Sequence, residues 1–394
     1  MNFHLSPELK QTRERVRAFV DEKIIPVEAE LVSDAKRTKL KALQAEVKAQ
    51  GLWTPHLPKS LGGLGLGPMG MATLFREMGR SPIGAKVFHC DAPDQGNMDL
   101  LVSTASEAQK KRWLEPLVRG EITSAFCMTE PAPGAGADPT NLKTAATPSG
   151  GGWVLNGQKW YSTGAKNASF LLVMARTSDD PKTGATVFLV DRHAKGVRYD
   201  RDIPVMSPDV LDHIEGQLTF EDVQLTKDDV LGEVGQGFQL AQTRLVPARL
   251  THCMRWLGLA TRTLEMCKGY LATRVSFGKE LARHQAVQIK IAENASAIHA
   301  GNLMTFHCAW MLEQGLTREA RPYSSMAKNH VARLLCQVLD DAIQLHGALG
   351  YSQDLPFSTW YRAARAARIA DGPDEVHQIT IARDFMLGRL EVLV

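Results

Sequence analysis

The chain is poor in cysteine, in clustered charge and in long apolar runs, and each deficit argues against a class of protein. Its six cysteines are scattered with no C-x-x-C pair, which disfavours a zinc site or a disulfide framework and favours a reducing compartment. Lysine plus arginine number 46 against 43 acidic residues, with no dense basic run, so we expect no nucleic-acid partner. The N-terminal stretch lacks an apolar signal core, and no run approaches the ~18–20 apolar residues of a membrane span. We therefore expect a cytoplasmic protein.

The sequence also lacks the usual nucleotide-binding motifs. The glycine-rich stretch HLPKSLGGLGLGPMG contains no lysine followed by serine or threonine, so it is not a P-loop. No G-x-G-x-x-G follows a strand, and strands do not alternate with helices, which excludes a Rossmann fold. A nicotinamide cofactor is therefore disfavoured.

The periodicity of apolar residues divides the chain into three parts. Residues 1–121 are mainly helical, residues 122–234 are rich in β-branched and aromatic segments, and residues 235–394 return to long helical patterns. Predicted helices span Ser6–Glu30, Ala35–Gln50, Met69–Arg80, Ala92–Ser103, Glu107–Val118, Phe238–Ala272, Glu280–Glu313, Arg318–His346 and Pro373–Leu390. Predicted strands begin near Ile122, Gly152, Phe170, Ala185 and Ile214, with turns at Asn156-Gly157, Asp180-Pro181 and Lys195-Gly196. We expect an α+β protein with an N-terminal helical domain, a central β-barrel or sandwich and a C-terminal helix bundle.

Near the C-terminus, the stretch IADGPDEVH predicts a turn that leads into a helix. Asp371 or Gly372 could cap that helix, which is the commoner role for such residues. Alternatively, Asp371 could point into a cleft and act as a base.

A second stretch, TEPAPGAGAD, begins near the predicted end of a strand at Thr129. Its small residues would let backbone N–H groups and hydroxyls approach a phosphate or a ring edge closely. A plain surface turn is the alternative interpretation.

Several stretches together resemble the acyl-CoA dehydrogenase family. They are TEPAPGAGAD, LNGQKWYSTG, TRVSFGKELARHQA, IQLHGALG and ADGPDEVH, and they occur in the family's order along essentially the whole chain. Phrases such as APDQGNMDLLV and ARLTHCMR further resemble the branch of family members ten and eleven. The resemblance implies the same three-domain order, with a C-terminal four-helix bundle.

The resemblance also implies an FAD cofactor between the β domain and the bundle, with contributions from a neighbouring subunit. By this resemblance Thr129 bonds the flavin edge, and Tyr161 and Thr163 cover and hold the ring. The adenine and pyrophosphate half of a partner's FAD is reached by Arg274 and Phe277. The bundle's own contact to the pyrophosphate comes from Gln344 and Gly347.

Asp371 takes the place of the glutamate base that most members have. An aspartate is one methylene shorter, so the backbone or the thioester must lie closer. Some members carry the base on an earlier helix, where this chain has Ala248, so that alternative is closed. Arg249 matches an arginine near the catalytic carboxylate, where a fixed cation would keep the carboxylate ionised until substrate arrives; a salt bridge between helices is its plainer role.

The chain departs from the family pattern at several positions. The loop after Thr129 is slightly longer than in simpler members, and Ala137 replaces a serine, so one hydroxyl contact is expected to be lost. Pro373 and Glu375 replace a threonine and a glutamine, which leaves their contacts to FAD in question. His346 and His377 have no second ligand at metal spacing, so we expect no metal site.

Three functions are compatible with these observations. The first is dehydrogenation of an acyl-CoA to the trans-2-enoyl-CoA, as in fatty acid β-oxidation, with an electron-transfer flavoprotein or similar acceptor. The second is a flavin oxidase of the nitroalkane-oxidase type, and the third is an idle member that binds flavin or a macromolecule. A cofactor shared between chains implies a homodimer or homotetramer. The sequence does not determine the acyl chain.

Overall fold

The computed structural model describes residues 5–33, 37–180, 183–207 and 214–391, and the chain divides into two compact units. Unit 1 comprises Met1–Phe88, Met206–Pro208 and Ala248–Val394. Unit 2 comprises His89–Val205 and Asp209–Pro247.

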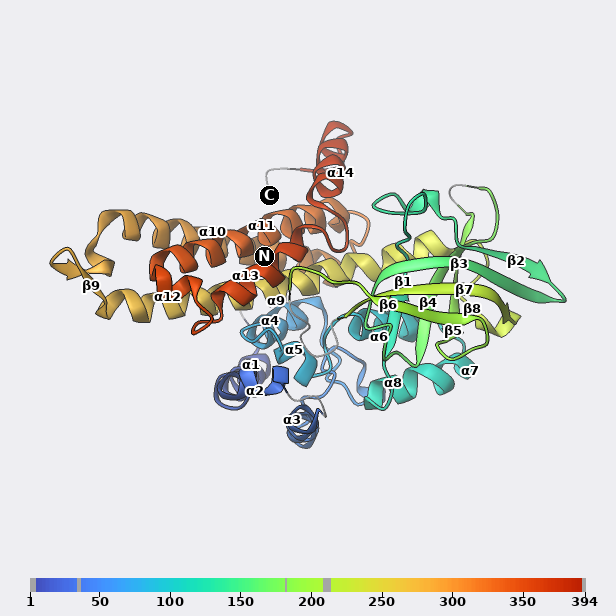
Figure 1. Ribbon diagram of the computed structural model, residues 1–394, viewed down its shortest axis with the longest axis horizontal. Helices are drawn as coiled ribbons and strands as arrows, with labels where there is room; N and C mark the ends of the chain where they lie inside the picture. Colours follow the sequence, from blue (N-terminus) through green and yellow to red (C-terminus); the bar gives the residue numbers. More distant parts are fainter. Residues whose placement is uncertain (1–4, 34–36, 181–182, 208–213, 392–394) are drawn as a thin grey trace. The chain divides into compact units, whose positions relative to one another are not determined.

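Where its residues are described, unit 1 is helical apart from one small hairpin (Figure 1). Its N-terminal helices are α1 (Pro7–Phe19), α2 (Glu28–Ser33), α3 (Thr38–Ala49), α4 (Pro68–Met78) and α5 (Gly84–Val87), with single turns η1 (Val20–Ile24), η2 (Ile25–Val27) and η3 (Lys59–Leu61). Its C-terminal elements are most of α9 (Gly237–Thr273), the hairpin β9 (Val275–Ser276) and β10 (Lys279–Glu280), η7 (Leu281–Arg283), α10 (Gln285–Glu313), α11 (Ala320–His346), α12 (Ala348–Tyr351), α13 (Phe357–Ala364), η8 (Arg365–Arg368) and α14 (Asp374–Met386).

The first predicted helix begins where expected and continues without a gap to Ser33, although its type changes from α to π at η1 and to 3₁₀ at η2 before α2. The Ser6 side chain accepts a hydrogen bond from the Leu9 N–H at 3.2 Å, and Pro7 occupies the first turn, so α1 has a good start. Pro26 cannot donate a backbone hydrogen bond, and the chain forms the 3₁₀ turn η2 there before α2 begins. The second predicted helix was to begin at Ala35, which lies outside the described residues; α3 begins at Thr38.

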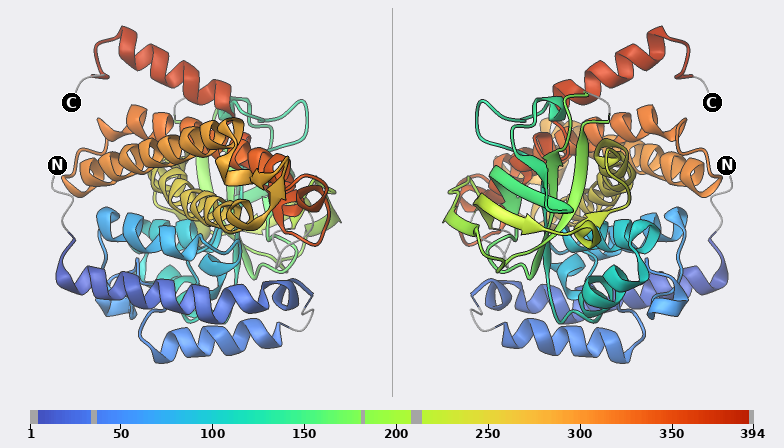
Figure 2. Two further views of the ribbon diagram at one scale, coloured as in Figure 1. Left: turned by 90° about the vertical axis from the view of Figure 1, so that its left-hand side faces the viewer. Right: turned by 90° about the vertical axis from the view of Figure 1, so that its right-hand side faces the viewer.

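The long helices of unit 1 share one apolar core. α10 and α11 run alongside each other, α13 and α14 pack on α11, and the β9–β10 hairpin lies at the end of the bundle where α9 meets α10 (Figures 1 and 2). Buried residues of this core include Leu257, Leu271, Val331, Leu339 and Phe357. Their helical spacing is the pattern that predicted the bundle. α12 and α13 were not predicted.

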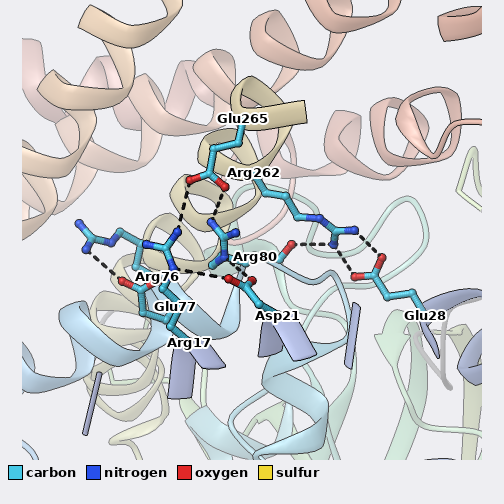
Figure 3. A network of polar contacts seen from close by, with 8 residues as sticks. All are labelled: Arg17, Asp21, Glu28, Arg76, Glu77, Arg80, Arg262 and Glu265. Atoms are coloured by element: carbon cyan, nitrogen blue, oxygen red, sulfur yellow. Dashed lines mark hydrogen bonds and ion pairs between the residues drawn. The ribbon is translucent and has the colours of Figure 1, made fainter. Parts of the chain in front are cut away.

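A network of arginines and acids joins α1, η1, α2, α4 and α9 within unit 1 (Figure 3). Arg262 of α9 donates to both oxygens of Glu28, at 2.6 and 3.0 Å, and to the Arg80 carbonyl at 3.0 Å. Arg80 in turn donates to Asp21 at 2.8 Å and pairs with Glu265 at 2.9 Å. Because Arg80 and Arg262 are buried, these bidentate and shared bonds are screened little by solvent.

We expect Arg262→Lys to destabilise the protein by about 1–3 kcal/mol, because a lysine cannot reproduce the fork that engages both Glu28 oxygens. Arg17→Lys is the matched control, since Arg17 is half-exposed and its ion pairs to Asp21 and Glu265 are both 3.5 Å long. Calorimetry should show an unfolding midpoint temperature below that of wild type for Arg262→Lys only. Equal midpoints for the two variants would contradict this reading of the network.

Unit 2 combines short helices with one sheet. Its helices are α6 (Asp94–Thr104), α7 (Glu107–Gln109), η4 (Lys110–Leu114), α8 (Glu115–Arg119) and the first turns of α9, with 3₁₀ turns η5 (Pro139–Asn141) and η6 (Lys227–Asp229). Its strands are β1 (Ser124–Cys127), β2 (Ala145–Ser149), β3 (Gly152–Thr163), β4 (Phe170–Arg176), β5 (Ala185–Asp191), β6 (Val197–Asp202), β7 (Glu215–Leu225) and β8 (Val230–Leu231).

The strands follow the order β6-β7-β3-β2-β4-β5-β8, and β1 pairs with β4 in parallel. β4 and β5 are buried along nearly their whole length, as their unbroken apolar sequences indicate. β2 contains Pro148, and β6 is mostly polar with only Val197 and Tyr199 packed on the core, so neither was predicted as a strand.

The predicted turn at Asn156-Gly157 is wrong. Both residues lie inside β3, where the pairing with β7 shifts register between Leu155 and Gly157. Gly157 has φ 144°, and a Cβ there would lie 2.6 Å from Thr144, so glycine serves a bulge rather than a hairpin. Of the predicted turn at Asp180-Pro181, Pro181 lies outside the described residues.

Helices thus precede Arg119, strands run from Ser124 to Leu231, and helices follow from Gly237, which is the predicted order of elements. The domain boundaries at 121 and 234 stay a prediction. Within the described ranges, no helix combines the length and apolarity that crossing a membrane requires.

Candidate active site

Asp371 lies in the turn before α14 and does not cap that helix. The N-cap residue is Pro373, and no side chain makes a capping hydrogen bond there, so the capping interpretation of Asp371 or Gly372 is wrong. Asp371 has φ 53°, a left-handed conformation that is uncommon for a residue with a side chain. Its side chain is 21% exposed. Asp371 therefore lies in a left-handed turn before α14 and does not cap the helix, as one interpretation had expected.

Two buried basic side chains hold the backbone of this turn. Arg249 Nε of α9 donates to the Asp371 carbonyl at 2.9 Å, and Lys328 Nζ of α11 donates to the Gly372 carbonyl at 2.6 Å. Burial lowers the pKa of Lys328, while the charges of Asp374 and Asp371 act in the opposite direction. The structure thus brings Arg249 and Asp371 together, as expected: Arg249 bonds to the Asp371 backbone carbonyl, and the charge of Asp371 also acts on Arg249.

Gly372 allows the turn to pass close to His377. Gly372 has φ 105°, and a Cβ there would lie 3.1 Å from His377 Nε2. His377 is buried in α14, and its Nδ1 lies 3.2 Å from the Ser325 hydroxyl. Burial, together with the charges of Arg249 and Lys328, lowers the pKa of His377 to about 4. His377 is therefore a buried, neutral residue beside the Asp371 turn near pH 7.

The start of α14 is fixed from its other side by Asp374. Its Oδ2 accepts from Arg368 Nε at 2.8 Å and pairs with Arg333 Nε at 3.3 Å. An acid in the first turn also suits the positive end of the helix dipole.

The carboxylate of Asp371 meets a histidine from α9. His252 Nε2 lies 3.2 Å from Asp371 Oδ2, and both side chains are about one-fifth exposed. Arg249 and His252 are three residues apart, so they project from the same side of α9 toward one residue. Sequence reasoning found Arg249 through the resemblance but missed His252 and Lys328.

In unit 2, the predicted ring-binding residues lie at the edge of β1 and β3. The Trp160 N–H donates to the Thr129 carbonyl at 3.0 Å, which brings the loop that starts at Thr129 beside β3. Tyr161 has φ 48° and is 48% exposed. Thr163 Oγ1 donates to the carboxylate of Glu215, at 2.9 Å to the nearer oxygen, so its own lone pairs remain able to accept.

One buried donor beside these residues is unsatisfied. The indole Nε1 of Trp160 is buried and has no hydrogen-bond partner among the residues that the structure describes. Such groups are uncommon in folded proteins and often mark a site for a bound molecule. Neither Glu215, the partner of Thr163, nor Trp160 could be singled out from the sequence, because both look like ordinary strand residues.

The loop that follows Thr129 is organised by a buried ion pair. Glu130 accepts from Lys159 Nζ at 2.8 Å and from the backbone N–H groups of Ala135, Lys143 and Thr144 at 3.2, 2.7 and 2.9 Å. Lys159 also donates to the Met128 carbonyl at 2.9 Å. Burial alone would raise the pKa of Glu130, but the charge and hydrogen bond of Lys159 bring it below the ordinary value. The loop is therefore a built feature rather than a plain surface turn.

The remaining predicted residues lie on the C-terminal bundle of unit 1. Phe277 and Gly278 form the turn of the β9–β10 hairpin, with φ 49° and 79°, as a two-residue type I′ turn requires. The Phe277 side chain is 95% exposed. Its positive φ is a strained backbone conformation for a phenylalanine. Arg274, Gln344 and Gly347 are also exposed, and Gly347 ends α11 with φ 60°. The side chains of Arg274, Phe277 and Gln344 and the backbone of Gly347 are therefore exposed to solvent.

Three family models match consecutive parts of the chain. The acyl-CoA dehydrogenase N-terminal domain matches residues 6–121, the middle domain residues 125–223 and the C-terminal domain residues 235–386. These matches and the solved structures confirm the expected α+β fold with its three successive parts.

Named relatives agree with the domain matches. The Mycobacterium tuberculosis protein "Probable acyl-CoA dehydrogenase FadE2" is 37% identical over 97% of this chain and 96% of its own length. Acyl-CoA dehydrogenase family member 11 of Gallus gallus is 36% identical over 99% of this chain, which spans only 52% of that relative. The chain thus spans about half the length of the member 11 relatives.

The fold has a close match among solved structures as well. Butyryl-CoA dehydrogenase from Megasphaera elsdenii is 25% identical with a TM-score of 0.85, covering 98% of this chain and 100% of that one.

We expect Glu130→Gln to destabilise the protein by about 3–5 kcal/mol, because it leaves Lys159 buried without its counter-charge. Since the folded-state pKa of Glu130 lies below its ordinary value of 4.5, this stabilisation is complete at neutral pH and is lost as pH falls through the folded-state pKa. Urea unfolding, followed by tryptophan fluorescence, should therefore show a large loss of unfolding free energy in the variant at pH 7 and a smaller loss in acid. The exposed Glu121→Gln is the control; a pH-independent gap for Glu130→Gln would contradict the assignment.

Proposed function

Because this chain belongs to the acyl-CoA dehydrogenase family, we propose that it binds FAD and oxidises an acyl-CoA thioester between Cα and Cβ to the trans-2-enoyl-CoA. The observation that carries the proposal is the Asp371 turn. A partly exposed carboxylate pairs with His252, the backbone of its turn is held by Arg249 and Lys328, and it serves no helix cap. A carboxylate fixed in this way suits a base that must meet one particular proton.

The residues of unit 2 fit a flavin ring. The unsatisfied Trp160 Nε1, the half-exposed Tyr161 ring and the Thr163 hydroxyl supply a donor, a flat apolar surface and an acceptor on one short stretch of β3. The loop at Thr129, which accepts a hydrogen bond from the Trp160 backbone, adds backbone groups beside them. We propose that Thr129, Tyr161 and Thr163 hold the ring.

The pyrophosphate and adenine half of FAD needs cations, close backbone approach and a flat apolar contact. At the exposed hairpin, Arg274 supplies a cation and Phe277 a flat apolar contact. At the end of α11, Gln344 offers a polar contact and Gly347 a backbone contact. We propose that Arg274 and Phe277 serve the FAD of a second copy of the chain, which makes the enzyme a homodimer or homotetramer.

In the proposed reaction, Asp371 accepts the α-proton of the thioester. Bound FAD would supply the acceptor for the β-hydrogen and its electron pair, so that a C=C bond would replace the two C–H bonds. Arg249 and Lys328 hold the turn still while the carboxylate gains its proton. An electron-transfer flavoprotein or similar acceptor would then reoxidise the cofactor, within a pathway such as fatty acid β-oxidation.

The left-handed turn accounts for an aspartate in this role. An aspartate reaches one methylene less far than the family's usual glutamate, so the Cα must lie closer to the thioester. Positive φ at Asp371 and at Gly372 changes the direction of the chain just before α14. We propose that this change of direction replaces the missing methylene.

Asp371→Asn should lower acyl-CoA-driven flavin reduction by about 10²–10⁴-fold, because it removes the proton acceptor and no carboxylate stands at position 248. FAD content should be unchanged, since no cap is lost. Asp371→Glu should recover only part of the rate, because the site is shaped for the shorter side chain. Stopped-flow absorbance of the flavin with a reactive acyl-CoA measures all of these rates.

Asp354→Asn is the matched control for Asp371→Asn, since Asp354 is an exposed acid of unit 1 outside the candidate site. Its reduction rate should equal that of wild type. Near-wild-type reduction in Asp371→Asn would place the base elsewhere. Rapid peroxide release with oxygen as sole acceptor would favour the oxidase over the dehydrogenase.

Arg274→Ala should weaken FAD retention by removing a charge-assisted bond to the pyrophosphate. Because the arginine would act on a second copy, the loss should grow on dilution. Flavin absorbance per chain after dilution and gel filtration measures the effect. Arg283→Ala, on an exposed arginine of the same connecting segment, should keep its FAD; full retention in dilute Arg274→Ala would remove the cross-subunit assignment.

A further inference from the structure

The Asp371 carboxylate is the end of a short chain of side chains on α9. Arg255 NH2 lies 2.9 Å from His252 Nδ1, and His252 Nε2 lies 3.2 Å from Asp371 Oδ2. The imidazole thus lies between a guanidinium and a carboxylate, with one ring nitrogen turned to each.

The partners of the ring assign its protonation. A guanidinium is always charged and can only donate, so His252 Nδ1 must accept and carries no proton. The proton of the neutral ring therefore lies on Nε2 and is donated to Asp371 Oδ2. A second proton on the ring would have to displace the bond from Arg255.

The plane of the ring is fixed as well. The His252 ring stacks on Trp256, with centroids 5.2 Å apart and planes 20° from parallel. Trp256 is the next-turn neighbour of His252 on α9. The Nε2–H direction is thereby set by a helix, a stacked ring and a charged donor together, rather than by the carboxylate it meets.

We propose that His252, with its tautomer set by Arg255, is a positioning residue that holds the Asp371 carboxylate in one rotamer and in its ionised form. The inference rests on the proposed role of Asp371 as base. His252 donates a hydrogen bond and does not itself take the α-proton, because both of its nitrogens are engaged. Arg255 acts on the ring through its bond to Nδ1.

The groups around this chain favour a neutral imidazole. Arg249 on α9 and Lys328 on α11 bind the Asp371 turn, and Arg255 on α9 binds the ring. Arg321 on α11 acts on Arg249, and Asp374 and His377 on α14 interact with Lys328. Most of these groups are basic, so a second positive charge on His252 is opposed.

The test compares three variants as FAD-loaded enzymes, by stopped-flow flavin reduction with one reactive acyl-CoA from pH 6 to 9. His252→Leu should reduce flavin about 10–100-fold more slowly, because Asp371 loses its positioning bond. His252→Gln retains an N–H near the position of Nε2 and should run at least ten times faster than His252→Leu. Binding of the enoyl-CoA product should be the same in both.

Arg255→Met should leave His252 Nδ1 without the Arg255 donor and so able to take a second proton in acid. A cationic His252 stabilises ionised Asp371 and makes it a weaker base, so the rate should fall from pH 9 to pH 6 by about five-fold more than in wild type. A structural role alone would lower the rate equally at every pH.

His299→Leu, on an exposed histidine of α10, is the control and should match wild type throughout. The positioning role is contradicted by a His252→Leu rate within two-fold of wild type, or by a His252→Gln rate as low as that of His252→Leu. If Asp371→Asn is inactive while His252→Leu is not slowed, only this inference fails. If Asp371→Asn stays active, the proposed base fails first.

Discussion

The hydrogen bonds from Arg249 and Lys328 to two successive carbonyls, of Asp371 and Gly372, are the interaction on which the candidate site depends. A turn that contains a left-handed aspartate is strained by about 1–3 kcal/mol and persists only where its surroundings impose it. Here the two donors come from different helices, α9 and α11, and both are buried. Packing of the bundle core thus fixes a backbone conformation that the local sequence would not adopt by itself.

Buried charged side chains also hold the backbone of the loop after Thr129 in unit 2. Glu130 gathers Lys159 and three backbone N–H groups, and the loop after Thr129 folds around that buried carboxylate. In each unit, a charged side chain that is removed from solvent satisfies backbone groups that a loop leaves unpaired. The residues proposed to meet substrate or flavin lie next to these anchors and do not supply the anchoring themselves. Stability and chemistry therefore depend on different side chains, which allows them to be tested separately.

Periodicity in the sequence was sufficient to predict the long helices and the buried strands, because these elements are specified by apolar residues at fixed spacing. It failed where local and tertiary signals conflict: Asn156-Gly157 has the composition of a hairpin turn but forms a bulge within β3. The Asp371 stretch and Arg249 could be selected by their motifs. His252, Lys328 and Glu215 could not, because each acquires its partner from a distant segment, and nothing in its neighbours along the chain records that contact. The capping interpretation of Asp371 was wrong because Pro373, not an acid, occupies the N-cap.

The claim that Asp371 takes the α-proton is tested most directly by following that proton alone. A 3-thia-acyl-CoA labelled with deuterium at Cα can lose its α-hydrogen but has no β-hydrogen to pass on, so exchange with solvent reports the base without the redox step. Mass spectrometry of the thioester after incubation in ordinary water with the FAD-loaded enzyme should show loss of the label with wild type. With Asp371→Asn, the label should be retained apart from the rate seen without enzyme. Equal loss of label with both proteins would contradict the account.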